Sequence, residues 1–379
     1  MRILVIGRSY PETYNGMLGT FELDQAQAIR NQGHEVRYFF CDTRSIFRIH
    51  KYDIVKHNYN GIVVTGCHLP IGRLPYVIYS KIKDKVFIKL LDQVVKEFKP
   101  EIIHIHYPAI VLTHNTWEHL KKIDARIVVT EHFSKVMTGQ ISKQKVKLLT
   151  KVVKDSYAFI CVSEKLRKSV EKLTGIQNKV VVIPNMVDNS FGLINIDNKS
   201  SETKFSYIGA ARKLKQIEVI VEACAIMSQK EADFKLEIVG DGPTLKHIKR
   251  KVLQLNLNDK VTFYGNVKRE QVAKILKDTD YFVTASKLET FCVPIVEAWL
   301  SGIPTIIPDS IPILNYATES NSYIFKDSDS RDLSEKMMLA LNNKEFDRNK
   351  ISQEAQQIFS AENVAQRIIE LYQVRSTEK

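Results

Sequence analysis

The sequence predicts an α/β protein built from two doubly wound, Rossmann-like domains. Three observations support this prediction. The chain has 379 residues, about twice the length of a typical domain. Short β-branched runs alternate with segments of helical periodicity, and this alternation stops once at a polar stretch and then restarts. With 44% hydrophobic and 9% aromatic residues, the composition is that of a globular chain and excludes a disordered one.

The first half of the chain contains seven strand-like runs, which are separated by longer segments. These runs are 2–7, 35–40, 61–65, 101–106, 126–131, 159–163 and 179–184. Segments such as 81–98 and 164–173 carry apolar residues at i, i+3 and i+4, as amphipathic helices do. Because helices separate consecutive strands, we expect a mainly parallel sheet in a domain of residues 1–188.

A polar, turn-rich stretch at 189–204 predicts a linker, which is followed by a second domain over 205–358. Strand-like runs there are 205–210, 234–240, 260–265, 281–286 and 303–309, and helix-like segments are 217–229, 244–255, 269–277 and 294–301. The last segment, 359–379, contains an amphipathic helix that we expect to pack back on the first domain. Ligands of doubly wound sheets bind at the carboxyl ends of the strands, so we expect the two domains to face each other across a cleft.

The formal net charge of +12 lies entirely in residues 1–190, which carry 29 Lys and Arg against 17 Asp and Glu. Such a half can meet anionic lipid, nucleic acid or a phosphorylated substrate, and a solvated basic face is the plain alternative. Segment 142–155 shows the same ambiguity, because its apolar stripe and five lysines fit either a helix on an anionic bilayer or a core-packed helix with a basic outer face.

The compartment predicted by the sequence is a reducing one. The five cysteines are widely spaced and contain no C-x-x-C pair, which indicates neither a disulfide framework nor a zinc site. The apolar run at the N-terminus stops at Gly7 without a cleavage site, and no stretch of 18 apolar residues occurs. We therefore expect a cytoplasmic protein, with attachment to the inner face of a membrane as an open alternative.

The most informative stretch is 286–309, where Glu289 precedes a helix that carries Glu297. Pro294 suits the first turn of that helix, and neither Cys292 nor Val293 is a good N-cap. A bound phosphate can supply the missing acceptor at the helix start, and the two carboxylates can accept hydrogen bonds from sugar hydroxyls. The alternative is that both glutamates are ordinary solvated or capping residues.

Two strand-to-glycine turns precede that stretch. Gly209 ends a strand and is followed by the cations Arg212, Lys213 and Lys215, which can clamp a diphosphate or merely face solvent. Gly240 ends the next strand in IVGDGP, where small residues allow a ligand close to the backbone.

In the first domain, Gly16 and Gly19 form a loop after the first strand, but G-x-G-x-x-G is absent, so Asp42 at the end of the second strand is weak evidence for NAD. The histidines differ in expected role. His104 and His106 lie within a strand and are expected to be packed, whereas His132 follows a strand end and is a candidate for the site. Their spacing does not match a metal-ligand pattern.

Taken in order, these segments resemble the large retaining glycosyltransferase family of the group 1, family-four type, which has the GT-B architecture. The likeness spans nearly the whole chain. The motifs that carry it are RILVIGRSYPETYNGMLGTF, NQGHEVRYF, PEIIHIHYP, IVVTEHFS, VSEKLRKSV, VVVIPNMVD, YIGAARKLKQIEVIVEA, LEIVGDGP, VTFYGNV and the E, seven residues, E signature from Glu289 to Glu297.

The resemblance implies roles for individual residues. It makes Glu289 and His132 the catalytic candidates close to the transferred sugar. The residues that it assigns to the donor are Gly19, Gly209, Arg212, Lys215, Gly240, Val267, Thr290, Phe291, Cys292, Val293 and Glu297. Within this set, Lys215 would bind the diphosphate and Glu297 the ribose. The chain departs from the family's pattern at Ala210, which replaces an Arg, and at four glycine positions, Met186, Gln216, Thr290 and Cys292.

The resemblance also implies an activity. It predicts transfer of a hexose from UDP- or GDP-sugar, with retention, to a glycan or lipid-linked acceptor in bacterial surface polysaccharide biosynthesis. The nucleotide-sugar is a substrate, and no cofactor, metal or nucleic acid is implied. The alternatives are a sugar-nucleotide epimerase of the same architecture, an NAD-dependent dehydrogenase, and a non-catalytic basic protein that binds RNA or a membrane.

Overall fold

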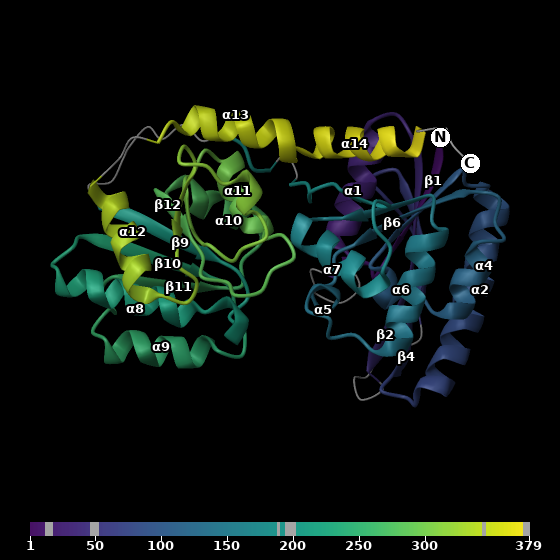
Figure 1. Cartoon of the computed structure of the whole chain (residues 1–379), viewed down its shortest axis with the longest axis horizontal. Helices are drawn as coiled ribbons and strands as arrows, with labels where there is room; N and C mark the ends of the chain where they lie inside the picture. Colours follow the sequence, from purple (N-terminus) through teal and green to yellow (C-terminus); the bar gives the residue numbers. More distant parts are fainter. Residues whose placement is uncertain (12–17, 46–52, 188–189, 194–201, 343–345, 374–379) are drawn as a thin grey trace. The chain divides into compact units, whose positions relative to one another are not determined.

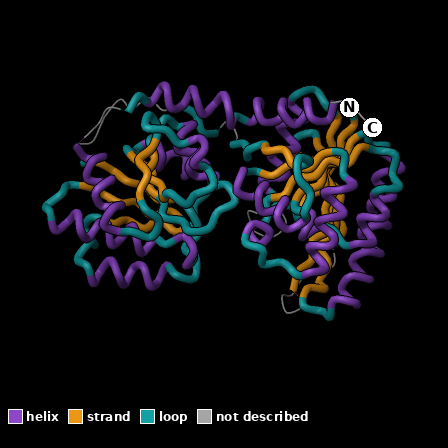
Figure 2. The backbone as a smooth tube through the Cα atoms, in the orientation of Figure 1, coloured by secondary structure: helices purple, strands orange, loops and turns teal. Residues whose placement is uncertain are grey.

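A computed structural model describes residues 1–11, 18–45, 53–187, 190–193, 202–342 and 346–373. The chain divides into two compact units (Figure 1). The first unit comprises Met1–Pro184 together with the C-terminal segment from Ala361, and the second comprises Asn185–Ser360. In each unit helices cover a central sheet, as the tube drawing in Figure 2 shows. Of the expected linker, residues 189 and 194–201 lie outside the described residues.

The sheet of the first unit has eight strands in the order β3-β4-β2-β1-β5-β6-β7-β8. All neighbours pair in parallel except β3 and β4. The strands are β1 (Arg2–Gly7), β2 (Glu35–Ser45), β3 (Asp53–Tyr59), β4 (Ile62–Gly72), β5 (Ile102–His106), β6 (Arg126–Glu131), β7 (Ala158–Cys161) and β8 (Val180–Val182). The sequence analysis missed β3, because this edge strand is largely exposed and therefore lacks an apolar run.

Eight α-helices are described in the first unit. They are α1 (Thr20–Asn31), α2 (Tyr76–Phe98), α3 (Pro108–Val111), α4 (His114–Leu120), α5 (Ser134–Met137), α6 (Lys143–Asp155), α7 (Glu164–Thr174) and α14 (Ala361–Gln373). The last of these packs against α1, and the Tyr372 hydroxyl lies 2.6 Å from Nδ1 of His104. The preceding helix belongs to the second unit, so the chain passes between the units at Ser360.

Two helices of this unit differ from expectation. α2 begins at Tyr76 rather than at 81, because the apolar residues of its first turns are exposed and give no amphipathic pattern. In α6 the apolar residues Leu148, Leu149, Val152 and Val153 are buried, and the helix contacts α3 and α7. The proposal that segment 142–155 lies on a bilayer is therefore wrong, since its apolar stripe is already covered by protein.

The sheet of the second unit has six parallel strands in the order β11-β10-β9-β12-β13-β14. The strands are β9 (Thr203–Ile208), β10 (Phe234–Val239), β11 (Val261–Gly265), β12 (Tyr281–Val283), β13 (Thr305–Pro308) and β14 (Ser322–Phe325). The helices are α8 (Ile217–Gln229), α9 (Leu245–Gln254), α10 (Arg269–Lys277), α11 (Val293–Leu300), α12 (Ser330–Asn342) and α13 (Arg348–Phe359). The core includes Phe205, Ile220 and Leu236, which are fully buried.

Both sheets are doubly wound and each has one point where the strand order reverses. In the first unit this point lies between β1 and β5, and in the second it lies between β9 and β12. Loops that leave the carboxyl ends of such neighbouring strands diverge to opposite faces, which opens a crevice for a ligand. The predicted α/β class is thus present in both units. Within the described residues, no helix combines the length and the hydropathy needed to cross a bilayer.

We expect Gly240→Ala to destabilise the second unit by about 3 kcal/mol or more. Gly240 has φ +129°, and a Cβ there would overlap the carbonyl oxygen of Gly209. Gly265→Ala is the matched control, because Gly265 also has positive φ (+67°) but open space around its Cα, so it should lose only about 1 kcal/mol. Calorimetric unfolding of the full chain checks this, and equal losses in both variants would contradict the steric argument.

Candidate active site

The reversal point of the second unit brings together two loops that carry most of the predicted donor residues. β9 and β12 pair in parallel, with Phe205 opposite Tyr281. The loop after β9 contains a 3₁₀ turn, Lys213–Lys215, and the backbone N–H of Lys287 donates to the carbonyl of Leu214 at 2.9 Å. This bond fixes the loop that follows β12 against the cationic turn.

Lys215 and Glu289 form an ion pair across these two loops, in which the Lys215 Nζ donates to the Glu289 Oε1. The side chains are 25% and 16% exposed, so solvent screens the pair only partly. Burial alone would lower the pKa of Lys215, but the adjacent Glu289 carboxylate outweighs it and leaves this pKa raised. The lysine therefore stays charged, and two residues that the sequence suggested for separate roles are in direct contact.

α11 begins beside this pair without a side-chain cap. Its N-cap residue, Cys292, has φ +83° and makes no capping hydrogen bond through its side chain, and a proline lies in the first turn. Burial, followed by the Glu289 charge, raises the pKa of the Cys292 thiol well above its usual range, so this thiol is neutral. The N-cap side chain thus leaves the positive end of the helix without a cap, and the anionic group that acts on the N-cap residue is the Glu289 carboxylate.

Two of the four positions where the family's motifs carry glycine keep a left-handed backbone in this chain. Gln216 has φ +47° and Cys292 has φ +83°. A non-glycine residue in this region costs roughly 1–2 kcal/mol, which the surrounding loops must offset. At these two positions the chain therefore carries a side chain on a left-handed residue. Met186 and Thr290 do not have positive φ.

The other predicted donor residues of this unit lie along the same edge of its sheet. Gly209 follows β9, Gly240 follows β10, and Val267 lies two residues beyond β11. The backbone N–H of Gly209 donates to the carbonyl of Val239 at 2.9 Å, which joins the first two turns. Arg212 is exposed, and Glu297 is half-buried one turn into α11, on the same side of the helix as Val293. Thr290 and Phe291 complete the loop before α11.

Gly19 belongs to the first unit, where it is the N-cap of α1. Its φ is +94°, and a Cβ there would overlap the carbonyl oxygen of Ser9. Only glycine therefore fits this turn.

The reversal point of the first unit carries a column of stacked side chains. The Arg8 guanidinium lies 3.5 Å from the centroid of the Tyr107 ring, and it also binds Glu22, with Nε 2.6 Å from Oε1. Tyr107 stacks on His132 with ring centroids 4.6 Å apart, and Nε2 of His132 lies 3.0 Å from Nδ1 of His106. The sequence analysis missed Arg8, Glu22 and Tyr107, although the positions of Arg8 and Tyr107 directly after β1 and β5 were available as a signal.

His104 and His106 are buried and neutral. His104 and His106 have pKa values well below the usual range, chiefly because burial disfavours their charged forms. The expectation that these two are packed is confirmed by their burial. In the contact between Nδ1 of His106 and Nε2 of His132, one ring nitrogen donates and the other accepts. Within the described ranges, no group of three His, Cys, Asp or Glu is arranged to hold a metal ion.

Glu131, which precedes His132, is a further candidate that the sequence analysis missed. It is fully buried at the end of β6, and its Oε1 accepts hydrogen bonds from the backbone N–H groups of His132 and Phe133 at 2.9 and 2.8 Å. Burial raises its pKa to about 7, although those backbone donors act in the opposite direction. The signal in the sequence that could have identified Glu131 is its position as an acidic residue at the end of an otherwise apolar strand-like run.

Asp42 has a structural role. It accepts a hydrogen bond from the Ser9 hydroxyl at 2.8 Å, and its Oδ2 lies 2.5 Å from Nε of Arg44 and 3.3 Å from Nδ1 of His68. Burial would raise the pKa of Asp42, but the hydrogen bonds from His68 and Ser9, together with the Arg44 charge, lower it. These contacts satisfy the Asp42 carboxylate within the protein, so its position at the end of β2 does not require a nucleotide ribose.

The chain matches two family models that together span most of its length. Residues 194–358 match the model described as Glycosyl transferases group 1, and residues 18–191 match the one described as Glycosyltransferase Family 4.

Two known proteins are similar to this chain at low identity. A phosphatidylinositol N-acetylglucosaminyltransferase subunit of Homo sapiens is 26% identical over 287 residues, which cover 71% of this chain and 59% of the human protein. The chain thus spans about three fifths of that relative. N-acetyl-alpha-D-glucosaminyl L-malate synthase of Bacillus anthracis is 25% identical over 309 residues, or 77% of this chain and 74% of that protein.

Among solved structures, HepE of Anabaena in complex with UDP and glucose has a TM-score of 0.71 at 16% identity, and the match covers 98% of each chain. This likeness confirms the predicted fold class, with two parallel-sheet Rossmann-like domains.

We expect Glu131→Gln to change how stability depends on pH. The pKa of Glu131 is raised from 4.5 to about 7, so the folded wild type loses stability as the pH rises through that interval. Glutamine keeps an acceptor for the two backbone donors and does not titrate. The variant should therefore gain about 3 kcal/mol relative to wild type between pH 5 and pH 8. Unfolding curves across this range measure the difference. Glu335→Gln, at an exposed position on α12, is the control, and a parallel pH profile for Glu131→Gln and wild type would refute the prediction.

Proposed function

Because this chain belongs to the group 1 glycosyltransferases of GT-B fold, we propose that it transfers a hexose from a UDP- or GDP-sugar to a glycan or lipid-linked acceptor. The observation that carries the proposal is the Lys215–Glu289 pair beside the uncapped start of α11. It places a cation, a carboxylate and the positive end of a helix at a strand-order reversal, where α/β sheets bind ligands.

In the proposed donor site, Lys215, Arg212 and the start of α11 receive the diphosphate. Negative charge accumulates on the departing diphosphate during transfer, and fixed cations and helix termini stabilise such charge. The diphosphate then competes with Glu289 for Lys215. As Lys215 turns to the phosphate, the Glu289 carboxylate becomes available to hydrogen bond the hydroxyls of the sugar. The same movement would therefore prepare both halves of the site.

Glu297 completes the donor site as the proposed acceptor of hydrogen bonds from the ribose hydroxyls. HepE, which has the same fold, is described with UDP and glucose, and this supports a nucleotide-sugar donor here. The proposal assigns the diphosphate charge to residues of this chain and includes no metal, cofactor or nucleic acid.

For the acceptor we propose the first unit, with His132 close to the transferred sugar. His132 directly follows the carboxyl end of β6, and its Nε2 lies 3.0 Å from Nδ1 of His106. The human relative is named for an acceptor that is a lipid, which supports a lipid-linked acceptor as one of the two classes. We place the enzyme in the cytoplasm, on the inner face of the membrane, in surface polysaccharide biosynthesis.

The donor site is tested by Lys215→Met and Glu297→Gln. Each removes a charge-assisted hydrogen bond to the nucleotide-sugar, so we expect the affinity for UDP or GDP to fall about 10- to 100-fold. Lys230→Met is the control, because Lys230 is an exposed lysine of the same unit that directly follows α8. Calorimetric titration measures the affinity, after a thermal-shift panel of UDP, GDP, ADP and CDP has identified the base. Unchanged nucleotide affinity in both Lys215→Met and Glu297→Gln would refute the proposed donor site.

Retention is a separate prediction. Starting from an α-linked nucleotide-sugar, proton NMR of the fresh product should show an α linkage to the acceptor. A β linkage would contradict retention. Conversion of the sugar in the absence of any acceptor would instead favour the epimerase alternative.

A further inference from the structure

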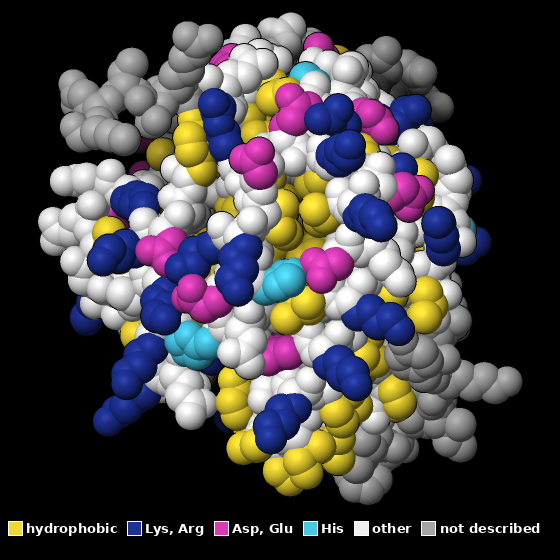
Figure 3. Space-filling model, turned by 90° about the vertical axis from the view of Figure 1, so that its right-hand side faces the viewer, with side chains coloured by type: hydrophobic (Ala, Val, Ile, Leu, Met, Phe, Trp, Pro, Cys, Tyr) yellow, Lys and Arg dark blue, Asp and Glu magenta, His cyan; other side chains and the backbone are white. Residues whose placement is uncertain are grey.

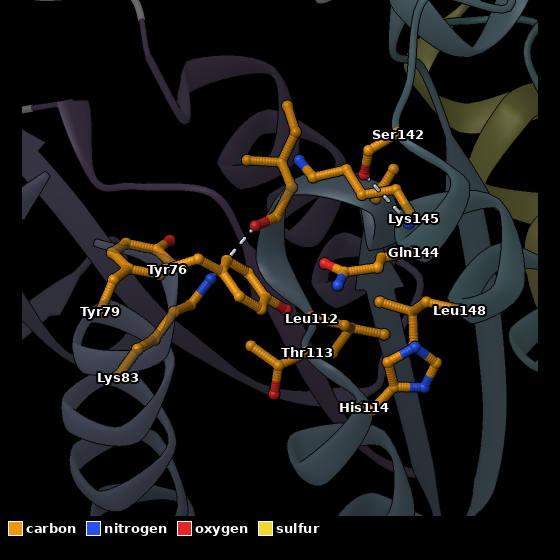
Figure 4. Close-up of a pocket in the computed structure, with 12 residues that line it drawn as sticks. Tyr76, Tyr79, Lys83, Leu112, Thr113, His114, Ser142, Gln144, Lys145 and Leu148 are labelled. Carbon is orange, nitrogen blue, oxygen red and sulfur yellow. Dashed lines mark hydrogen bonds between the residues drawn. The ribbon is translucent and has the colours of Figure 1, made fainter. Parts of the chain in front are cut away.

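A cavity of about 280 Å³ lies at the carboxyl edge of the sheet in the first unit. Its wall is formed by the start of α2, the segment that joins α3 to α4, and the start of α6, as Figure 4 shows. These three segments follow the carboxyl ends of β4, β5 and β6, the edge at which doubly wound sheets bind ligands. Small-molecule sites begin at about 300 Å³, so this cavity suits a ligand the size of one sugar residue.

Glu131 connects the cavity with His132, the residue that we place close to the transferred sugar. Burial raises the pKa of Glu131, and the backbone N–H of Ala109, which lines the cavity, is among the donors that act against it. Oε1 of Glu131 also accepts a hydrogen bond from the backbone N–H of His132 at 2.9 Å. One buried side chain therefore separates a ligand in the cavity from the proposed acceptor residue.

Two lysines make the cavity positively charged. Lys83 and Lys145 line it from α2 and α6, and none of the described lining residues is a carboxylate. Lys83 is 2% exposed, and its Nζ donates to the carbonyl of Ile110 at 3.1 Å. An ammonium group has three donors and a carbonyl carries no net charge, so this bond leaves both donors and charge for a ligand.

The acidic groups behind the cavity wall leave this positive charge in place. Asp84 accepts a hydrogen bond from the Thr113 hydroxyl at 2.6 Å. Burial lowers the pKa of Lys145, the charge of Lys83 lowers it further, and the opposite effect of Glu131 does not restore it. Two cations that act on each other in one cavity favour an anionic ligand between them.

Other lining residues suit the ring of a sugar. Tyr76 and Tyr79 are stacked with their ring centroids 6.4 Å apart, and His114 and Gln144 add an imidazole and an amide. Figure 4 shows the two tyrosines on one side of the cavity and Gln144 on the other. Sugar rings have apolar C–H faces that pack on aromatic rings, and hydroxyl groups that hydrogen bond to amide and imidazole groups.

The surface around the cavity has the same sign of charge. The net charge of +12 lies entirely in residues 1–190. In Figure 3, which looks onto the first unit, Lys and Arg side chains are spread over the visible face. A positive field of this kind raises the rate at which an anionic ligand meets the protein.

We propose that the acceptor carries an acidic sugar and that this cavity holds it, with Lys83 and Lys145 on its carboxylate or phosphate and the tyrosines on its ring. This inference rests on the proposed function, because it names the class of acceptor that the first unit takes. A neutral sugar would leave the two lysines without an anionic partner, so the cavity selects its ligand by charge.

The direct test is NMR titration of the full chain with three sugars. Methyl glucuronoside carries a carboxylate, glucose 6-phosphate carries a phosphate, and methyl glucoside is neutral. We expect at least one of the acidic sugars to bind about ten-fold more tightly than methyl glucoside, and the one that does so identifies the anionic group. Equal affinity for all three sugars would overturn the proposal.

Lys145→Gln should lower the affinity for the acidic sugar about ten-fold and leave that for methyl glucoside unchanged, because it removes one charge-assisted hydrogen bond. Lys147→Gln, at an exposed position of the same helix, is the control and should change the affinity less than two-fold. Equal losses in both variants would show attraction to a basic surface rather than a site. Lys83→Met should act like Lys145→Gln, and its thermal shift with UDP shows whether this buried substitution leaves the chain folded; if it does not, Lys145→Gln decides.

A transfer assay distinguishes failure of this inference from failure of the proposed function. With the acidic sugar as acceptor, Lys145→Gln should raise KM about ten-fold and leave kcat within two-fold of wild type. Transfer to methyl glucoside with the same kcat/KM as to the acidic sugar would overturn the acidic acceptor and leave the transferase function. Absence of UDP and GDP binding, together with binding of the acidic sugar that depends on Lys145, would instead refute the donor site and support the cavity.

Discussion

Parallel pairing at a strand-order reversal is the constraint on which the rest of this structure depends. In the second unit it places the ends of β9 and β12 side by side, so that Lys215 meets Glu289, which lies 74 residues further along the chain. In the first unit the same arrangement of β1 and β5 brings Arg8 onto the ring of Tyr107. At each reversal point, the paired strands thus bring together side chains that are distant in sequence.

The buried charged residues of the first unit differ in the partners that surround them. The Asp42 carboxylate contacts a hydroxyl, a guanidinium and an imidazole group, so its hydrogen bonds are made within the protein. Glu131 accepts hydrogen bonds from the backbone N–H groups of His132 and Phe133, but burial outweighs them and raises its pKa to about 7. Lys83 and Lys145 share a cavity without a lining carboxylate.

The sequence analysis succeeded where a residue's position along a strand or helix determines its surroundings. The absence of a good N-cap at Cys292 was visible in the sequence, and the structure has no side-chain cap there. It failed where exposure removes the pattern, as for β3 and the first turns of α2. It also failed for Glu131, because one acidic residue in a strand does not reveal whether a partner lies across the sheet.

The sequence by itself determined the α/β class, the two sheets and most of the residues that edge the second sheet, because periodicity and turn chemistry are local properties of the chain. Only the tertiary structure decided that Lys215 pairs with Glu289, that Asp42 is an internal acceptor, and that Lys83 and Lys145 line one cavity. These contacts depend on strand order and helix packing, which arise from long-range burial and which the spacing of residues in one sequence does not encode.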